Sequence, residues 1–347
     1  MSEVLVDIEG KAGRLRLNRP QAIHALTHAM CTRMLAALVE WRDNATVKAV
    51  MIDHAEGRGF CAGGDVRALA ESGAGDGSTA RAFFHEEYRL NNLLFTYRKK
   101  TIVFMDGITM GGGVGIALPC QYRVATENTR FAMPETAIGL FPDVGGGWYL
   151  SRLPGRVGQF LALTGARLDG AECHYLGLAT HYIPQASLDE VKEQIAARPE
   201  RIEGILGKAS VTPPPARIAD NLVHLNKAFA SDRFEEILEA LEADESEWAK
   251  TELATLTAKS PQACKVSLRL LAQGAKVQNF ADEMRQEYAV AARVVQRPDF
   301  AEGVRAVLID KDNQPKWEPP TPEGVTDQML DTIFAPLPSK EEWTPLP

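Results

Sequence analysis

The sequence predicts an α/β fold followed by a largely helical region. Two observations support this prediction: strand-like segments alternate with amphipathic helices up to about residue 150, and residues 185–296 then have a mostly helical composition. The chain has 347 residues, of which 45% are hydrophobic, so it can bury a sizeable core. We therefore expect a folded globular protein rather than a disordered chain.

The N-terminal residues predict a hairpin, a helix and a strand. Apolar and polar residues alternate at 4–8 and at 15–17, on either side of a turn with two glycines, which is typical of a β-hairpin. Thr27 stands where it would cap a helix, because apolar residues share one face of the segment that follows. Residues 47–53 indicate a buried strand.

A long helix and further strands are predicted next. An apolar stripe runs along residues 78–99, as expected of an amphipathic helix, and 101–105 is a short apolar run that indicates a strand. Residues 122–125 and 130–132 predict a second hairpin, joined by a turn at 127–128.

The second half of the chain contains two proline-rich segments. Pro213, Pro214 and Pro215 cannot continue a helix, so they predict a linker within the helical region. From Asp312 onwards the chain is again rich in proline, and we expect an extended tail packed on the surface.

Charge and cysteine content argue against several classes of protein. The formal net charge of -8, from 38 Lys and Arg against 46 Asp and Glu, disfavours general binding to nucleic acid. Five cysteines without a C-x-x-C pair indicate neither a disulfide framework nor a zinc site, and no other metal signature is complete, so we expect no metal. The N-terminus is acidic and no uninterrupted apolar run is long enough for a membrane span, so we expect a cytoplasmic protein without membrane contact.

Two glycine clusters, at 57–65 and 111–113, each follow a predicted strand and precede a predicted helix. Glycine could simply permit tight turns there. Alternatively, the missing side chains let backbone N–H groups approach a ligand oxygen at the start of a helix. Two such junctions could form an oxyanion hole for a thioester or ester carbonyl. Spacing alone favours this second interpretation only slightly.

The motifs around these clusters resemble a known family. Residues 60–65 (FCAGGD), 110–113 (MGGG) and 131–135 (FAMPE) resemble, in order and spacing, the crotonase superfamily of enoyl-CoA hydratases and isomerases. Longer blocks resemble the 3-hydroxyisobutyryl-CoA hydrolase branch of that superfamily: residues 85–88, 106–115, 131–147 and 302–312. The similarity runs from the first hairpin to about Trp317.

The resemblance implies a crotonase-type spiral core of ββα units, followed by helices that cap the site or join subunits. We accordingly expect a core with the acyl-CoA site at 1–200, a helical region at 201–311 and a proline-rich tail at 312–347. The family binds acyl-CoA thioesters without a metal or redox cofactor, so CoA would enter only as part of the substrate. Helices that join subunits could instead fold back on their own chain, which leaves a homo-oligomer open.

The resemblance also implies roles for five residues. Gly64 and Gly112 match the two oxyanion donors of the superfamily, and Glu135 and Asp143 match the catalytic acids of the hydrolase branch. Glu87 would line the substrate pocket, although its neighbours on the predicted helix are typical of a solvated face. Asp143 precedes a glycine run, so it could alternatively cap a helix.

Two departures from the superfamily pattern bear on the reaction. Gly115 stands where the hydratases carry a second catalytic glutamate, and glycine supplies neither the acid nor the base that adding water to a C=C bond needs. His24 stands where the superfamily usually has asparagine, and we expect it to be structural. Asp65 is expected to cap a helix, and Cys61 to pack in the core.

These residues predict a 3-hydroxyacyl-CoA thioesterase, most similar to the 3-hydroxyisobutyryl-CoA hydrolases of valine breakdown. Glu135 would activate water, or would attack the thioester carbonyl itself to give a mixed anhydride. An enoyl-CoA isomerase on the same scaffold is the alternative, and a hydratase is less expected. A non-catalytic CoA-binding protein is least expected, because Glu135 and Asp143 are both present.

Overall fold

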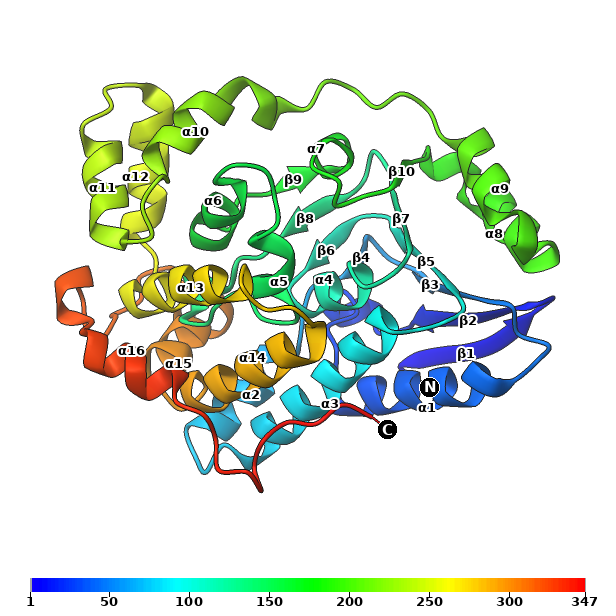
Figure 1. The fold of residues 1–347 in the computed structure, drawn as a ribbon, viewed down its shortest axis with the longest axis horizontal. Helices are drawn as coiled ribbons and strands as arrows, with labels where there is room; N and C mark the ends of the chain where they lie inside the picture. The colour runs from blue at the N-terminus through cyan, green and yellow to red at the C-terminus, as the bar shows by residue number, and fades with distance from the viewer. Residues whose placement is uncertain (1, 347) are drawn as a thin grey trace.

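A computed structural model describes residues 2–346 and contains two β-sheets (Figure 1). The larger sheet has the strand order β1-β2-β3-β5-β7-β10. β1 and β2 are antiparallel, which confirms the first predicted hairpin, and the remaining neighbours pair in parallel. These strands are β1 (Val4–Glu9), β2 (Ala12–Leu17), β3 (Ala49–His54), β5 (Lys100–Met105), β7 (Tyr122–Ala125) and β10 (His181–Tyr182).

The smaller sheet has the order β4-β6-β8-β9. Three times the chain places one strand in the larger sheet and the next in the smaller sheet before it enters a helix: β3 and β4, β5 and β6, then β7 and β8. This repeated path is the spiral of ββα units that the resemblance implies. The strands of the smaller sheet are β4 (Gly59–Cys61), β6 (Ile108–Met110), β8 (Arg130–Ala132) and β9 (Leu168–Asp169).

The prediction of a second hairpin is wrong. β7 lies between β5 and β10 of the larger sheet, whereas β8 lies between β6 and β9 of the smaller one. Two threonines hold the corner between the sheets, because Thr126 Oγ1 donates to Asp106 at 2.7 Å and Thr129 Oγ1 donates to the Met105 carbonyl at 2.6 Å. In sequence, a short polar connection looks the same whether its two strands pair with each other or with different sheets.

The N-terminal helices form largely where they are predicted. The Thr27 side chain accepts a hydrogen bond from the Met30 N–H at the start of α1, as predicted. α3 ends at Phe95 rather than Lys99, because Lys100 already pairs in β5. The first group of helices is α1 (His28–Asp43), α2 (Val66–Gly73), α3 (Ser78–Phe95), α4 (Gly112–Ala117), α5 (Gly146–Leu150), α6 (Val157–Thr164) and α7 (Gly170–Tyr175).

The later helices form two groups around the core. Figure 1 shows α8 (Leu188–Ala197) and α9 (Ile202–Ala209) on the opposite side of the molecule from α10 (Leu222–Ala228), α11 (Phe234–Glu242) and α12 (Glu247–Thr257). The segment 211–216 joins the two groups without regular structure and contains the three prolines, as the linker prediction requires. Three further helices return to the core and contact α5, α3 and α2 in turn: α13 (Pro261–Gly274), α14 (Phe280–Val294) and α15 (Pro298–Val304).

The segment after Asp312 is not wholly extended, in contrast to the expectation. It contains the helix α16 (Asp327–Phe334), in which Leu330 and Ile333 are buried. Further along, Trp343 is fully buried and its Nε1 donates to the carbonyl of His85 in α3 at 3.0 Å. The C-terminal segment therefore packs against α3.

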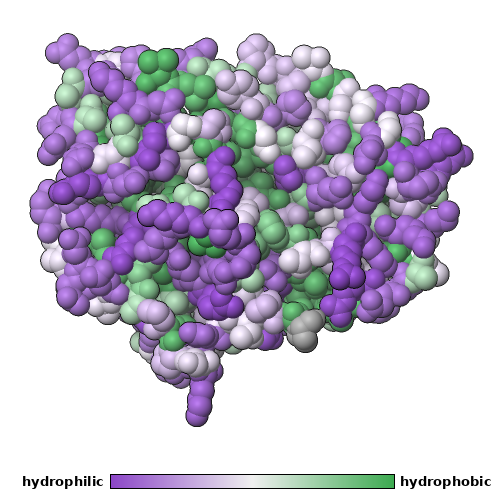
Figure 2. Space-filling view, in the orientation of Figure 1, coloured by the Kyte–Doolittle hydropathy of each residue, from purple (hydrophilic) through white to green (hydrophobic). Residues whose placement is uncertain are grey.

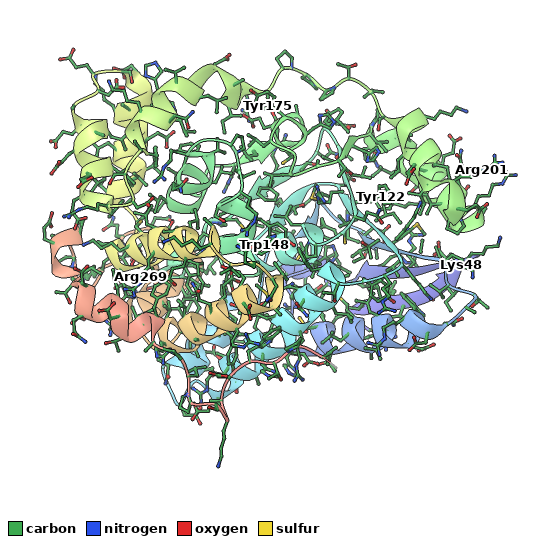
Figure 3. All side chains as sticks on the ribbon, viewed as in Figure 1. Lys48, Tyr122, Trp148, Tyr175, Arg201 and Arg269 are labelled. Carbon is green, nitrogen blue, oxygen red and sulfur yellow. The ribbon has the colours of Figure 1, made fainter. Side chains whose placement is uncertain are left out.

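An aromatic cluster fixes α5 against α3 and α14. Phe95 stacks on Phe280 with ring centroids 4.2 Å apart, and Trp148 lies edge-on to both rings. Trp148 is labelled near the middle of the molecule in Figure 3. The Arg152 guanidinium covers the Trp148 ring at 3.6 Å from its centroid. These contacts join three helices that are far apart in the sequence.

The surface is mainly polar on the face shown in Figure 2, where hydrophobic residues occur in small, separate patches. Long cationic side chains such as Lys48 and Arg201 lie at the periphery (Figure 3). Among residues 2–346, no helix combines the length and the apolar character that crossing a membrane requires.

Candidate active site

The structure brings all five predicted site residues to a single cavity of about 440 Å³. Gly64 and Gly112 come from the two glycine loops, Glu87 from α3, and Glu135 and Asp143 from the segments that follow β8. The remaining wall is largely apolar and includes Val66, Leu69, Phe83, Phe84, Ile138 and Leu140. A concave, mainly apolar site with a few convergent polar groups is typical of small-molecule binding.

The two glycine loops lie next to each other because β4 and β6 are parallel neighbours that end at the same edge of the smaller sheet. Gly63 and Gly111 have φ values of 120° and 47°, a region that side chains disfavour. A Cβ atom on Gly112 would lie 3.2 Å from the amide nitrogen of Gly64, so the two backbone N–H groups are neighbours. Within residues 2–346 neither of these N–H groups donates a hydrogen bond, and both are available to one ligand oxygen.

Glu135 begins the short 3-10 helix η2 (Glu135–Ile138) directly after Pro134. Its carboxyl lies against the second glycine loop, because a Cβ atom on Gly111 would be 3.1 Å from Glu135 Oε1. Only 5% of the residue is exposed, and Oε2 has no hydrogen-bond partner among the described residues. Burial raises the pKa of Glu135 well above its usual range, and the nearby Asp143 adds to the rise. A carboxylate with a raised pKa is a stronger base, as proton abstraction requires.

Asp143 lies in the loop between η2 and α5, and its side chain accepts a hydrogen bond from the Tyr88 hydroxyl at 2.7 Å. Burial raises the pKa of Asp143 to about 6, although this hydrogen bond opposes the rise. The N-cap of α5 is Gly145, so the helix-cap alternative for Asp143 is wrong. The next residue, Val144, has a φ of 52°, which is strained for a β-branched side chain.

Glu87 points inward from α3 and is only 2% exposed, so the solvated face suggested by its neighbours does not include it. Its Oε1 has no hydrogen-bond partner among the described residues and would lie 2.5 Å from a Cβ atom on Gly112. Burial raises the pKa of Glu87, followed by the effect of Asp143 and then of Glu135. Three carboxyl groups therefore share one cavity, which disfavours charging all of them at once.

Other sequence predictions near the site have mixed outcomes. Cys61 is fully buried in the core, as expected. His24 is also buried, with its ring nitrogens in hydrogen-bonding contact with the Arg19 N–H and the Glu56 carbonyl, which agrees with a structural role. Asp65 occupies the N-cap position of α2, but its side chain makes no cap hydrogen bond and pairs instead with Arg19 at 2.7 Å.

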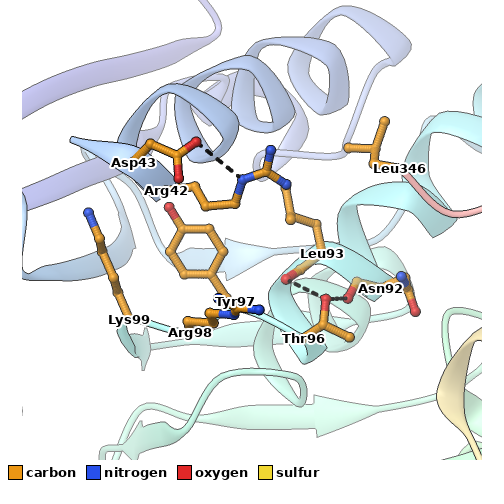
Figure 4. A pocket seen from close by; sticks show the side chains of 9 residues that line it. All are labelled: Arg42, Asp43, Asn92, Leu93, Thr96, Tyr97, Arg98, Lys99 and Leu346. Carbon is orange, nitrogen blue, oxygen red and sulfur yellow. Dashed lines mark hydrogen bonds and ion pairs between the residues drawn. The ribbon is translucent and has the colours of Figure 1, made fainter.

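A separate cavity of about 600 Å³ lies at the C-terminal ends of α1 and α3 (Figure 4). Lys99 Nζ donates to the carbonyls of Trp41 and Asn44, and the Tyr97 hydroxyl donates to the Leu38 carbonyl. These side chains satisfy the free carbonyls at the end of α1. This cavity contains none of the predicted site residues.

Sequence comparison decides the family. The family model for enoyl-CoA hydratase/isomerase matches residues 12–334. The chain belongs to the enoyl-CoA hydratase/isomerase family. Among its curated relatives are the mitochondrial 3-hydroxyisobutyryl-CoA hydrolases of Danio rerio, 40% identical over 98% of this chain and 91% of the relative, and of Homo sapiens, 39% identical over 98% and 90%.

Two solved structures share the fold of this chain over almost its whole length. A protein described as a carnitinyl-CoA dehydratase from Mycobacterium thermoresistibile has a TM-score of 0.94 and 39% identity, over 99% of both chains. An enoyl-CoA hydratase from Rhodobacter sphaeroides has a TM-score of 0.92 and 35% identity, over 99% of this chain and 100% of its own. These matches confirm the predicted fold over almost the entire chain.

The expected cytoplasmic location is wrong. The 3-hydroxyisobutyryl-CoA hydrolases that align with 96–98% of this chain are named as mitochondrial proteins. The expectation relied on the composition of the N-terminal residues. That composition is weaker evidence for a compartment than the compartment given for relatives that align with almost the entire chain.

Several residues at the candidate active site have no role that the sequence predicts. Tyr88 contacts Asp143, and Arg167 and Lys259 line the cavity. Behind the Asp143 loop, the Glu287 carboxylate accepts hydrogen bonds from the N–H groups of Gly145 and Gly147. No local pattern identifies these residues. Glu287 and Glu283, four residues apart in α14, form a spacing of acids that usually indicates a solvated helix face.

The prediction that no metal is needed remains untested. Across residues 2–346, no group of three or more His, Cys, Asp and Glu side chains is arranged to hold a metal ion.

Proposed function

We propose that the protein is an acyl-CoA thioester hydrolase whose substrate is 3-hydroxyisobutyryl-CoA or a closely similar short 3-hydroxyacyl-CoA. The observation that supports this most strongly is the pair of available N–H groups on Gly64 and Gly112 beside the buried carboxyls of Glu135 and Asp143. The curated relatives named as 3-hydroxyisobutyryl-CoA hydrolases support the substrate class. Valine breakdown is the process that this substrate implies.

The two glycine loops would bind the oxygen that becomes negatively charged during the reaction. The thioester carbonyl accepts hydrogen bonds from the Gly64 and Gly112 N–H groups, at the ends of β4 and β6. Nucleophilic addition to the carbonyl carbon moves an electron pair onto this oxygen. Donors already fixed in place stabilise that charge without reorganising.

Glu135 would then carry out the first step in one of two ways. As a general base it takes a proton from water, whose oxygen attacks the carbonyl carbon, and collapse of the adduct breaks the C–S bond. As a nucleophile its carboxylate attacks directly and expels the thiolate, and water afterwards hydrolyses the mixed anhydride. In both routes Asp143 begins ionised and orients water or the substrate hydroxyl. The proton that ends on the leaving thiolate comes from the attacking water. Glu135 takes it first in the general-base route, and Asp143 takes it during hydrolysis of the mixed anhydride and passes it to the thiolate.

Glu87 is proposed to bind the substrate rather than to break its thioester bond. Its carboxyl lies beside Gly112, and Phe83 and Phe84 of the same helix also line the cavity. A raised pKa favours a protonated Glu87, which can donate to a polar group of the acyl chain as well as accept from one. This fits an acyl group that carries a hydroxyl.

The C-terminal region closes this cavity within the same chain. Val307 and Leu308, in the short π-helix η6 (Arg305–Ile309) after α15, line it together with the catalytic candidates. Fold-back of these helices on their own chain is one of the two arrangements that the resemblance allows. A homo-oligomer remains a prediction.

A thiol-release screen across short branched and hydroxylated acyl-CoAs tests the proposal. The hydrolase releases free CoA from 3-hydroxyisobutyryl-CoA, whereas an enoyl-CoA isomerase rearranges an enoyl substrate and releases none. A non-catalytic CoA-binding protein turns over no acyl-CoA. Absence of thiol release from every 3-hydroxyacyl-CoA, with isomerisation or hydration in its place, would overturn the proposal.

Tyr88→Phe is expected to shift the acid limb of the pH–activity profile to higher pH. The Tyr88 hydroxyl lowers the pKa of Asp143 against the effect of burial, so its removal lets that pKa rise from about 6. The charged form of Asp143 then exists only at higher pH. A hydrogen bond to a charged group contributes about 1.5–3 kcal/mol, which corresponds to roughly one to two pH units. Measuring kcat/KM between pH 4 and 9 checks this, and an unchanged acid limb in folded Tyr88→Phe would contradict it.

Gly115→Glu is expected to destabilise the protein rather than to create a hydratase. A Cβ atom at Gly115 would lie 2.5 Å from Val144 Cβ and 3.0 Å from Asn91 Nδ2, so there is no room for a carboxylate. Overpacking typically costs about 1–3 kcal/mol, and a buried unpaired charge adds to that. Thermal denaturation and crotonyl-CoA hydration are measured together. Efficient hydration by a stable variant would show that Gly115 alone determines the reaction type.

A further inference from the structure

The loop that carries Asp143 is held from behind by a carboxylate of α14. Glu287 Oε2 accepts from the Gly145 N–H at 2.8 Å, and Glu287 Oε1 accepts from the Gly147 N–H at 3.1 Å. The residue is fully buried, 140 positions away from the loop in sequence. A carboxylate that uses both oxygens on two backbone donors fixes their spacing and direction.

A second buried carboxyl, Glu283, lies one helical turn before Glu287 and touches the same loop. A Cβ atom on Gly147 would lie 1.9 Å from Glu283 Oε1, so this glycine is required for the contact. Both carboxyls meet at Gly147, where Glu287 Oε1 accepts from the N–H and Glu283 Oε1 occupies the space that a side chain would fill, and neither Glu283 oxygen has a hydrogen-bond partner among the described residues. Two adjacent buried carboxyls can form a hydrogen bond only when one of them carries a proton.

We propose that Glu287 is a positioning residue for Asp143, and that it acts as the ionised member of a carboxyl pair whose proton resides on Glu283. The Glu283 O–H donates to Glu287, and Glu287 in turn accepts from both loop N–H groups. This inference rests on the proposed hydrolase function, in which Asp143 must be held in one orientation. It assigns Glu287 no contact with the substrate.

Two helices thus fix Asp143 from two sides. Tyr88 of α3 holds its side chain, and Glu287 of α14 holds the backbone two and four residues further along. Val144, the strained residue between the two anchors, shows that the loop is constrained by its surroundings. A displacement of about 1 Å at a catalytic group can cost roughly 10²-fold in rate.

The pair faces few other titratable groups. Burial raises the pKa of Glu287, and Glu283 adds to that rise, while burial likewise raises the pKa of Glu283. α13 presents the apolar side chain of Leu270 to Gly147. The titratable and charged groups that face the pair are Tyr88 from α3, Asp143 from the loop, and Tyr149 and Arg152 from α5 and its C-terminal end.

The kinetic test compares the wild type with Glu287→Gln and Glu283→Gln. Glutamine at 287 keeps one acceptor but turns an N–H₂ toward the second loop N–H, so we expect kcat for thiol release to fall 10- to 100-fold with KM within about threefold. Glutamine at 283 still donates to Glu287 in place of the shared proton, so we expect kcat within about threefold of the wild type. Equal losses in both variants, or an undiminished kcat in Glu287→Gln, would overturn the proposal.

A stability measurement tests the shared proton without any substrate. A buried acid with a raised pKa keeps its proton in the folded state when the unfolded chain has lost it, so folding stability falls as pH rises above the unfolded pKa. We expect the Tm of Glu283→Gln, measured relative to that of the wild type, to increase as the pH is raised from 5 to 9. A Tm difference that is independent of pH would overturn the pair. Absent thiol release by the wild type would instead reject the hydrolase function, and this Tm comparison would still be decisive for the pair.

Discussion

Glu135→Gln is expected to lower kcat for thiol release by roughly 10³-fold, because the amide can neither take a proton from water nor attack the carbonyl. The protein should remain folded, since Glu135 is only 5% exposed and one of its carboxyl oxygens has no hydrogen-bond partner among the described residues. Removing a group that is costly to bury should leave Tm unchanged or higher. The measurements are kcat on a purified folded variant and Tm by thermal denaturation.

Glu71→Gln is the matched control for this substitution. Glu71 is an exposed glutamate in α2, close in sequence to the first glycine loop. We expect its activity and Tm to equal those of the wild type. Wild-type turnover by properly folded Glu135→Gln would remove Glu135 from the chemistry.

Gly112→Val is expected to lower kcat by roughly 10²- to 10³-fold, the usual effect of losing one oxyanion donor. The first carbon of the new side chain would lie 2.5 Å from Glu87 Oε1 and 3.2 Å from the Gly64 nitrogen, which is the space that the thioester oxygen needs. Affinity for the CoA portion should change less, because the new side chain enters the space between Glu87 Oε1 and the Gly64 nitrogen, where only the thioester oxygen is expected to bind. The experiment measures kcat, KM and Tm on the same preparations.

The control for Gly112→Val must be a glycine whose side-chain space is open. Gly115→Ala, a natural choice from its position one turn along α4, is unsuitable because its Cβ atom would meet Val144 at 2.5 Å. Gly204→Val in α9 is suitable, since no atom lies within 4 Å of the added Cβ. If Gly112→Val only lowers Tm and the folded fraction keeps its specific activity, Gly112 serves packing and not catalysis.

The parts of the fold that follow from local patterns could be predicted from the sequence. The hairpin of β1 and β2, the cap at Thr27 and the break at the proline run depend on neighbouring residues, and the structure confirms them. The assignment of β7 and β8 to different sheets depends on which strands lie beside them, and no local pattern encodes that. The prolines on either side of α16 indicate an extended chain, whereas the helix depends on the burial of Leu330 and Ile333.

In the candidate site, too, local sequence predicts some features and tertiary packing determines the others. The glycine loops could be predicted because conformations such as that of Gly111 need glycine, and the matching motifs identified Glu135 and Asp143. That Glu87 points inward is decided by the packing of α3. The contacts that hold Asp143, from Tyr88 and Glu287, join residues 55 and 140 or more positions apart and are visible only in the folded chain.

The most direct test of the central claim sets thioester hydrolysis against hydration on one preparation of the wild-type protein. Free CoA release from 3-hydroxyisobutyryl-CoA and hydration of crotonyl-CoA are measured as kcat/KM at the same pH. With Glu135 and Asp143 beside the Gly64 and Gly112 donors and glycine at 115, we predict that release exceeds hydration by at least about 10²-fold. Hydration that equals or exceeds CoA release would contradict the account.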